Sequence, residues 1–158
     1  MPKFETQINQ IFLVHPESKK NSLILYEEKL KDQLHLFFLL ELVDIKKKTE
    51  ANELKKISEA ILGGFRKNIK MPTNSMFEAT LAEINNSLAD LAHKGSKSWL
   101  GKFSALIALR SDSEMLLANA GQASAWIKRK RDFSEVLPPE KRRDETLLLL
   151  VRMSCVAP

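Results

Sequence analysis

The fold of this chain is decided by residues 103–137, FSALIALRSDSEMLLANAGQASAWIKRKRDFSEVL. Within it, residues 103–110 and 115–119 predict two antiparallel strands. The polar run between them, residues 111–114, consists of residues that favour turns by hydrogen bonding their own backbone. The stretch therefore predicts a β-hairpin at the centre of a sheet.

The first of these predicted strands is apolar on both of its faces. Ala105, Ile107 and Leu109 alternate with Leu106 and Ala108, and successive side chains of a strand point to opposite faces. A strand of this kind needs cover on both sides. We therefore expect further layers of structure above and below it.

Beyond the hairpin the chain is expected to remain extended. Gly121 permits a bend or a bulge, after which residues 123–128 should continue the same sheet. A basic turn then leads to a last short extended segment, residues 133–137, which Pro138 and Pro139 close.

Two amphipathic helices are expected before this hairpin. The first begins near Thr49, and Gly63-Gly64 marks either its end or a close contact with the sheet. The second follows the break at Met71-Pro72 and ends near Gly95. Apolar residues recur every three or four positions in both, and these are Leu54, Ile57, Ile61, Phe65 and Ile69, then Phe77, Leu81, Ile84, Leu88 and Leu91.

Shorter apolar runs predict strands before the helices. Residues 10–14, 22–26 and 34–44 fit this description, although 34–44 is also compatible with a short helix. The charged residues 27–33 are expected to form a hairpin loop or one turn of helix. The fold class that follows is α+β, with an antiparallel sheet and an antiparallel helix pair packed on one face.

Composition indicates an ordinary globular domain. The chain has 158 residues, 44% of them hydrophobic and 28% charged. A single cysteine, Cys155, cannot form an internal disulfide and suits a reducing compartment. The N-terminus lacks a secretory pattern, and no apolar run approaches the roughly 20 residues that span a bilayer. We expect a cytoplasmic protein that does not enter membranes.

Residues 118–126, ANAGQASAW, resemble the strand-turn-strand segment of PPM-type (PP2C-like) protein phosphatases. That family usually reads Asn-x-Gly-Asp-Ser-Arg-Ala-Tyr there. Asn119, Gly121 and Ala125 match, whereas Gln122 replaces the aspartate and Trp126 replaces the tyrosine. The order of expected elements is also similar to the first half of the PPM α-β-β-α sandwich.

The resemblance implies a truncated domain over residues 1–137. The second half of the family's domain has no counterpart here. Residues 138–158 form a tail in which Asp144 and the run 147–153 resemble the family's closing strand. We expect this tail to pair at a sheet edge, and an unrelated tail is an equally good alternative.

The resemblance also implies where metals would bind. PPM phosphatases use carboxylates to hold two divalent ions, manganese or magnesium, and a bridging water. The first metal motif falls at Asn21-Ser22, which offers no carboxylate, and the second at Asp44, where Ile45 replaces a glycine. Asp44 and Asp144 are thus vestigial metal-ligand candidates, and no resident cofactor is expected.

A basic segment beside an aromatic residue is the other functional signal. Trp126 precedes Lys128, Arg129, Lys130 and Arg131, and the chain has a net charge of +5. Cations interleaved with an aromatic side chain are typical of nucleic-acid surfaces, although a solvated turn has the same composition. These five residues are the candidate binding residues.

Three functions follow as hypotheses. The first is a catalytically inactive PPM-like domain that binds or regulates a protein partner. The second is an active metal-dependent serine/threonine phosphatase with displaced ligands, which would need manganese or magnesium. The third is a basic protein that binds nucleic acid.

Overall fold

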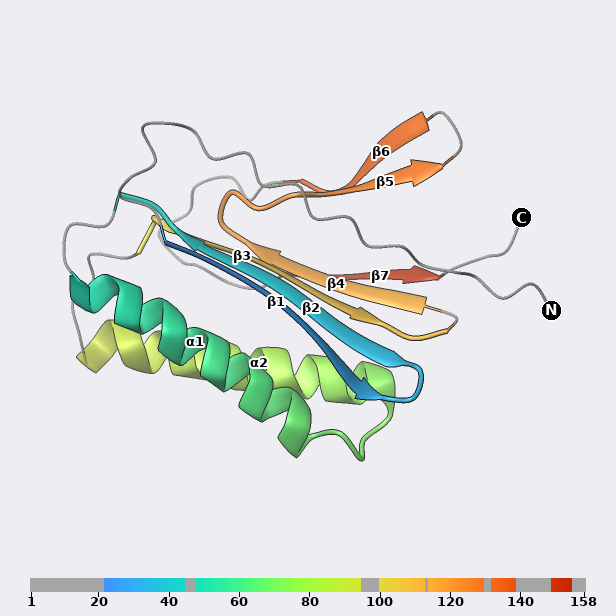
Figure 1. The fold of residues 1–158 in the computed structure, drawn as a ribbon, viewed down its shortest axis with the longest axis horizontal. Helices are drawn as coiled ribbons and strands as arrows, with labels where there is room; N and C mark the ends of the chain where they lie inside the picture. The colour runs from blue at the N-terminus through green and yellow to red at the C-terminus, as the bar shows by residue number, and fades with distance from the viewer. Residues whose placement is uncertain are drawn as a thin grey trace.

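The computed structural model describes residues 22–44, 48–94, 100–112, 114–129, 132–138 and 149–154. Their fold is α+β, with two helices packed on one face of an antiparallel sheet (Figure 1). The main sheet has five strands in the order β1-β2-β3-β4-β7. These are β1 (Ser22–Lys31), β2 (Leu34–Leu42), β3 (Phe103–Arg110), β4 (Glu114–Ala120) and β7 (Leu149–Ser154). The predicted strand at residues 10–14 lies outside the described residues.

The β1–β2 hairpin is longer than the sequence suggested. Residues 27–31 continue β1, and the turn occupies only Asp32 and Gln33, so the prediction of a loop or helical turn over 27–33 is wrong. A charged residue on the helix side of this strand needs a partner, and Glu28, which faces the helices, has one. There its carboxylate accepts hydrogen bonds from Arg66 of α1, at 2.9 Å to Oε1 and 3.0 Å to Oε2 from Nη2.

Both predicted helices are present, as α1 (Lys48–Lys67) and α2 (Thr73–Lys94). Their apolar stripes pack into one core with the inner face of the sheet. Gly63-Gly64 does not end α1, and its close contact is with α2 rather than with the sheet. A Cβ built on Gly64 would lie 2.8 Å from the Cγ2 atom of Thr80.

The helices cover only one face of β3. Phe103, Ala105, Ile107 and Leu109 are buried beneath them, whereas Leu106 lies on the opposite face and is half-buried. No described helix lies on that opposite face (Figure 1). The expectation of cover on both sides therefore holds for one face of the described structure.

The chain leaves the main sheet after β4. β5 (Ala125–Arg129) and β6 (Asp132–Leu137) pair with each other in a separate two-stranded sheet. The prediction that residues 123–128 continue the main sheet is therefore wrong. Figure 1 shows this β5–β6 ribbon on the side of the main sheet away from the helices.

The tail returns to the main sheet. β7 pairs antiparallel with β4, from Glu114 opposite Ser154 to Asn119 opposite Leu149. This strand forms one edge of the main sheet, as expected for a closing strand. Asp144 lies outside the described residues.

Neither described helix combines the length and the apolar character needed to cross a membrane.

Candidate functional site

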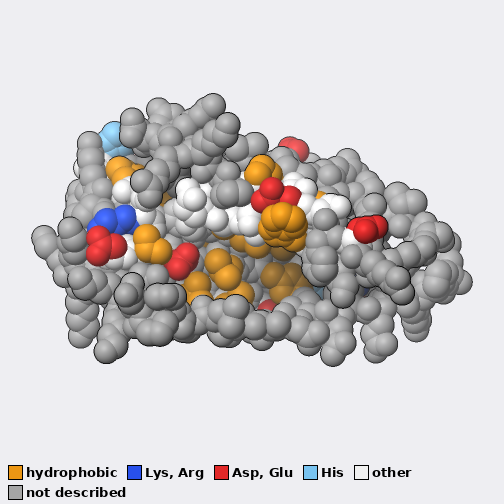
Figure 2. Space-filling model, turned by 90° about the horizontal axis from the view of Figure 1, so that it is seen from above, with side chains coloured by type: hydrophobic (Ala, Val, Ile, Leu, Met, Phe, Trp, Pro, Cys, Tyr) orange, Lys and Arg blue, Asp and Glu red, His pale blue; other side chains and the backbone are white. Residues whose placement is uncertain are grey.

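The main sheet presents an apolar surface on the side away from the helices. The strand registers place its side chains in two neighbouring rows that cross the sheet. Five of the six are half-buried, and Leu117 is buried. Figure 2 looks onto this side and shows hydrophobic side chains gathered in the middle of it. We call this surface the open face, and it consists of Leu25, Leu39 and Leu106 in one row and Phe37, Ala108 and Leu117 in the next.

A basic row borders the open face near the β1–β2 turn. Lys29 pairs with His35 across β1 and β2, and His35 pairs with Arg110 across β2 and β3. The ring of His35 stacks with that of Phe37, with centroids 6.2 Å apart. Lys29 and Arg110 thus lie on the two strands that flank β2, with His35 between them.

The β5–β6 ribbon carries the exposed aromatic residue that the sequence singled out. The side chain of Trp126 is 59% exposed, and its Nε1 donates to Ser124 Oγ at 3.3 Å. Trp126 pairs with Glu135 across the ribbon, and Arg129 pairs with Asp132. Lys128 and Arg129 belong to the end of β5, whereas Lys130 and Arg131 lie outside the described residues.

The segment that resembles the phosphatase motif has a structural role. Asn119 is 3% exposed, and its Nδ2 donates to the carbonyl oxygens of Ala123 at 2.8 Å and Pro138 at 2.9 Å. Gly121 has a φ of +67°, and a Cβ there would clash with the carbonyl oxygen of Phe103. The backbone N–H of Gln122 donates to Ser104 Oγ at 3.1 Å. These contacts fix the point where the chain turns from β4 into the ribbon.

Asp44, the metal-ligand candidate, lies beside a cation at the end of β2. The Lys102 ammonium donates to the Asp44 carbonyl oxygen at 3.0 Å and lies 3.7 Å from its carboxylate Oδ2. Asp44 also has a positive φ of 51°, which helps the chain to leave the strand. Among the described residues, no group of three or more His, Cys, Asp or Glu side chains is arranged to hold a metal ion.

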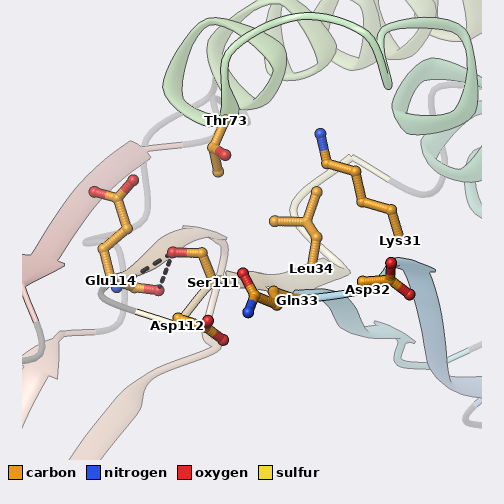
Figure 3. A pocket seen from close by; sticks show the side chains of 8 residues that line it. All are labelled: Lys31, Asp32, Gln33, Leu34, Thr73, Ser111, Asp112 and Glu114. Carbon is orange, nitrogen blue, oxygen red and sulfur yellow. Dashed lines mark hydrogen bonds between the residues drawn. The ribbon is translucent and has the colours of Figure 1, made fainter. Parts of the chain in front are cut away.

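A hollow of about 460 Å³ lies between the β1–β2 turn, the β3–β4 turn and the start of α2 (Figure 3). Asp32, Ser111 and Glu114 line it, and Thr73 faces them from α2. Ser111 Oγ lies 3.3 Å from both the backbone N–H and the carbonyl oxygen of Glu114. The Ser111 hydroxyl therefore closes the β3–β4 turn, which is a structural role.

No family model matches the chain, and no curated protein or solved structure matches it either. The likeness to PPM phosphatases therefore depends on residues 118–126 and on the order of elements.

Sequence reasoning missed the basic row. Lys29 lies in residues 27–33, the segment predicted to form a hairpin loop or one turn of helix. Four of the five residues in 27–31, EEKLK, are charged, so no alternation of charged and apolar residues indicated a strand there. Only the strand registers bring Lys29, His35 and Arg110 together.

Proposed function

We propose that this chain is a catalytically inactive PPM-like domain that binds a protein partner. The observation that carries the proposal is the open face, an apolar surface on the helix-free side of a five-stranded sheet. Contiguous apolar surface on a folded domain is typical of interaction sites, because covering it removes apolar area from water.

Two further features support binding rather than catalysis. The Asp44 carboxylate, the metal-ligand candidate, lies 3.7 Å from the Lys102 ammonium, which would compete with a metal ion for it. The motif residues Asn119 and Gly121 hold a turn together through hydrogen bonding and close packing. Asp44, Asn119 and Gly121 thus each make a contact within the fold that does not involve a metal ion or a substrate.

The test is a selection of peptides from a random display library, made in parallel on the wild-type protein and on Leu106→Glu. We expect the wild-type protein to enrich peptides that Leu106→Glu fails to bind, because the substitution places a charge in the middle of the open face. Ala82→Glu, at an exposed position of α2, is the matched control. Circular dichroism should show that all three proteins are folded. Selection of the same peptides by wild type and Leu106→Glu would overturn the proposal.

The enzyme alternative needs a separate assay. In-line attack on a phosphoester by this class needs a metal-activated water. We expect millimolar manganese or magnesium to leave hydrolysis of p-nitrophenyl phosphate at the level of the buffer blank. Metal-dependent turnover that disappears in Asp44→Asn would favour the phosphatase.

A further inference from the structure

Glu41 and Arg110 lie at opposite ends of the open face. The register of β2 with β3 gives the helix-free side of these strands four successive rows, of which the two inner ones are apolar. From one end to the other, the rows are Glu41 with Ser104, Leu39 with Leu106, Phe37 with Ala108, and His35 with Arg110. One end of the face therefore carries a carboxylate and the other a guanidinium.

Neither of these two charges is used within the described part of the chain. Glu41 and Arg110 are both half-buried, and none of the ion pairs among the described residues involves either of them. The other charged residues on this side lie on β1, at the edge of the sheet, where Lys29 pairs with Asp32 at 3.8 Å and Glu27 is exposed. A half-buried charge is stabilised by an opposite charge, so Glu41 and Arg110 are available to a partner.

We propose that the open face is covered by the open face of a second copy of this chain, with the strands of the two sheets running in opposite directions. This inference rests on the proposed function, and it names the partner. A two-fold axis that runs across the strands, between the two apolar rows, exchanges the two ends of the face. Glu41 of each copy then faces the row that carries the partner's Arg110, and the Leu39 row of each copy faces the Phe37 row of the other.

Charge decides the orientation of the two copies. In the antiparallel arrangement Glu41 lies one strand away from the partner's Arg110, a step of about 5 Å that a long arginine side chain can span, and the two-fold axis forms this contact twice. A two-fold axis parallel to the strands would instead place the row of Glu41 opposite the same row of the partner, so that like charges would meet. The antiparallel arrangement is therefore the one that the two charges favour.

The β5–β6 ribbon locates the contact on the open face. The ribbon lies on the same side of the main sheet, and its β6 strand approaches the sheet at β4. Leu117, the open-face residue of β4, is buried, whereas the open-face residues of β1, β2 and β3 are half-buried. The contact between two copies is therefore centred on β2 and β3, where side chains of two stacked sheets interdigitate.

Sedimentation equilibrium of the full-length chain measures the association. We expect a monomer–dimer equilibrium that Leu106→Glu abolishes, because this substitution places a charge between the two apolar rows. Glu41→Arg and Arg110→Glu should each raise the dissociation constant of the dimer by roughly tenfold or more, because each variant dimer holds two contacts between like charges. Glu78→Arg and Lys56→Glu, at exposed positions of α2 and α1, are the matched controls and should leave the constant unchanged.

An equimolar mixture of Glu41→Arg and Arg110→Glu should restore the dimer. In a mixed dimer both contacts again join opposite charges, one with the native signs and one with the signs exchanged. Native mass spectrometry separates this mixed dimer from the two homodimers by mass. Restoration would also show that both variants are folded, because mixing does not rescue an unfolded chain.

Three results would overturn the inference. The first is a wild-type chain that stays monomeric, and the display selection on that monomer would still judge the proposed function. The second is a dimer that survives Leu106→Glu, because its interface would lie elsewhere. The third is a mixture of the two charge variants that associates no better than either variant alone. A peptide and a second copy would compete for the open face, so the display selection is made on dilute, immobilised protein.

Discussion

Asn119 and Pro138 are joined by a hydrogen bond of 2.9 Å although 19 positions separate them in the chain. The donor is the side-chain amide of Asn119, which is buried at the end of β4, and the acceptor is the carbonyl oxygen that follows β6. The same amide donates to Ala123, which precedes β5. One side chain thus binds both ends of the β5–β6 ribbon to the main sheet.

Replacement of Asn119 should therefore loosen the ribbon and destabilise the fold. Asn119→Ala leaves two carbonyl oxygens without this donor, and we expect a loss of roughly 1–3 kcal/mol in the free energy of unfolding. Urea unfolding measures it. Asn86→Ala, at an exposed position of α2, is the control. Equal stability of the two variants would show that the amide does not hold the ribbon.

The two adjacent glycines of α1 should respond in opposite directions to alanine. Gly64→Ala places a methyl group 2.8 Å from Cγ2 of buried Thr80, and overpacking of this kind costs about 1–3 kcal/mol. Gly63→Ala meets no atom within 4 Å and should stabilise the helix by about 1 kcal/mol. Thermal unfolding of both variants checks the pair. A stabilised Gly64→Ala would mean that α1 and α2 are further apart.

Periodicity explains why the helices and most strands could be predicted. Apolar stripes such as Leu81, Ile84 and Leu88 predict helices from sequence alone, and all three residues are buried. The departure of β5 from the main sheet could not be predicted in this way. It depends on contacts between distant segments, such as Gln122 with Ser104. The hydrogen-bond partners of Asn119 are likewise known only once the strands are placed.

A chain that ends at Pro138 should lose stability. It lacks β7, so the edge of β4 from Glu114 to Asn119 loses its antiparallel partner. We expect the melting temperature to fall by roughly 5 °C or more and aggregation through the uncovered edge to increase. A chain that ends at Ser154 keeps β7 and is the matched control. Identical melting of the two shortened chains would show that β7 contributes nothing.

The Lys67–Glu83 pair makes stability depend on pH. The Lys67 ammonium donates to Glu83 Oε1 at 2.7 Å and holds the pKa of that carboxyl below its ordinary value of 4.5, despite the opposing effect of desolvation. A carboxyl with a lowered folded pKa stabilises the fold above its unfolded pKa, and this contribution is lost as the pH falls through the folded pKa.

Removal of the ammonium tests this linkage. In Lys67→Met the pKa of Glu83 should rise, because its hydrogen-bond donor and the nearby positive charge are gone. Carbon-detected NMR titration of the Glu83 carboxyl measures it. The difference in stability between wild type and variant should shrink as the pH falls below 4.5. A Glu83 titration that is unchanged in the variant would show that the two side chains do not interact in solution.

The candidate site was only partly visible in the sequence. Leu106 and Ala108 could be assigned to a second apolar face of their strand, and Trp126 stood out beside a basic run. The basic row could not be predicted, because Lys29, His35 and Arg110 come from three strands and meet only through the registers of two strand pairs.

The most direct test of the account is a methyl NMR titration of the protein with a peptide that the wild-type protein enriches from the display library. Leu39 and Leu106 belong to the open face, whereas Leu40 and Ile107, their immediate neighbours, face the helices. The account predicts that the methyl signals of Leu39 and Leu106 shift most, with smaller changes at Leu40 and Ile107. Shifts that instead cluster on α1 and α2, or at Thr73 beside the hollow, would contradict it.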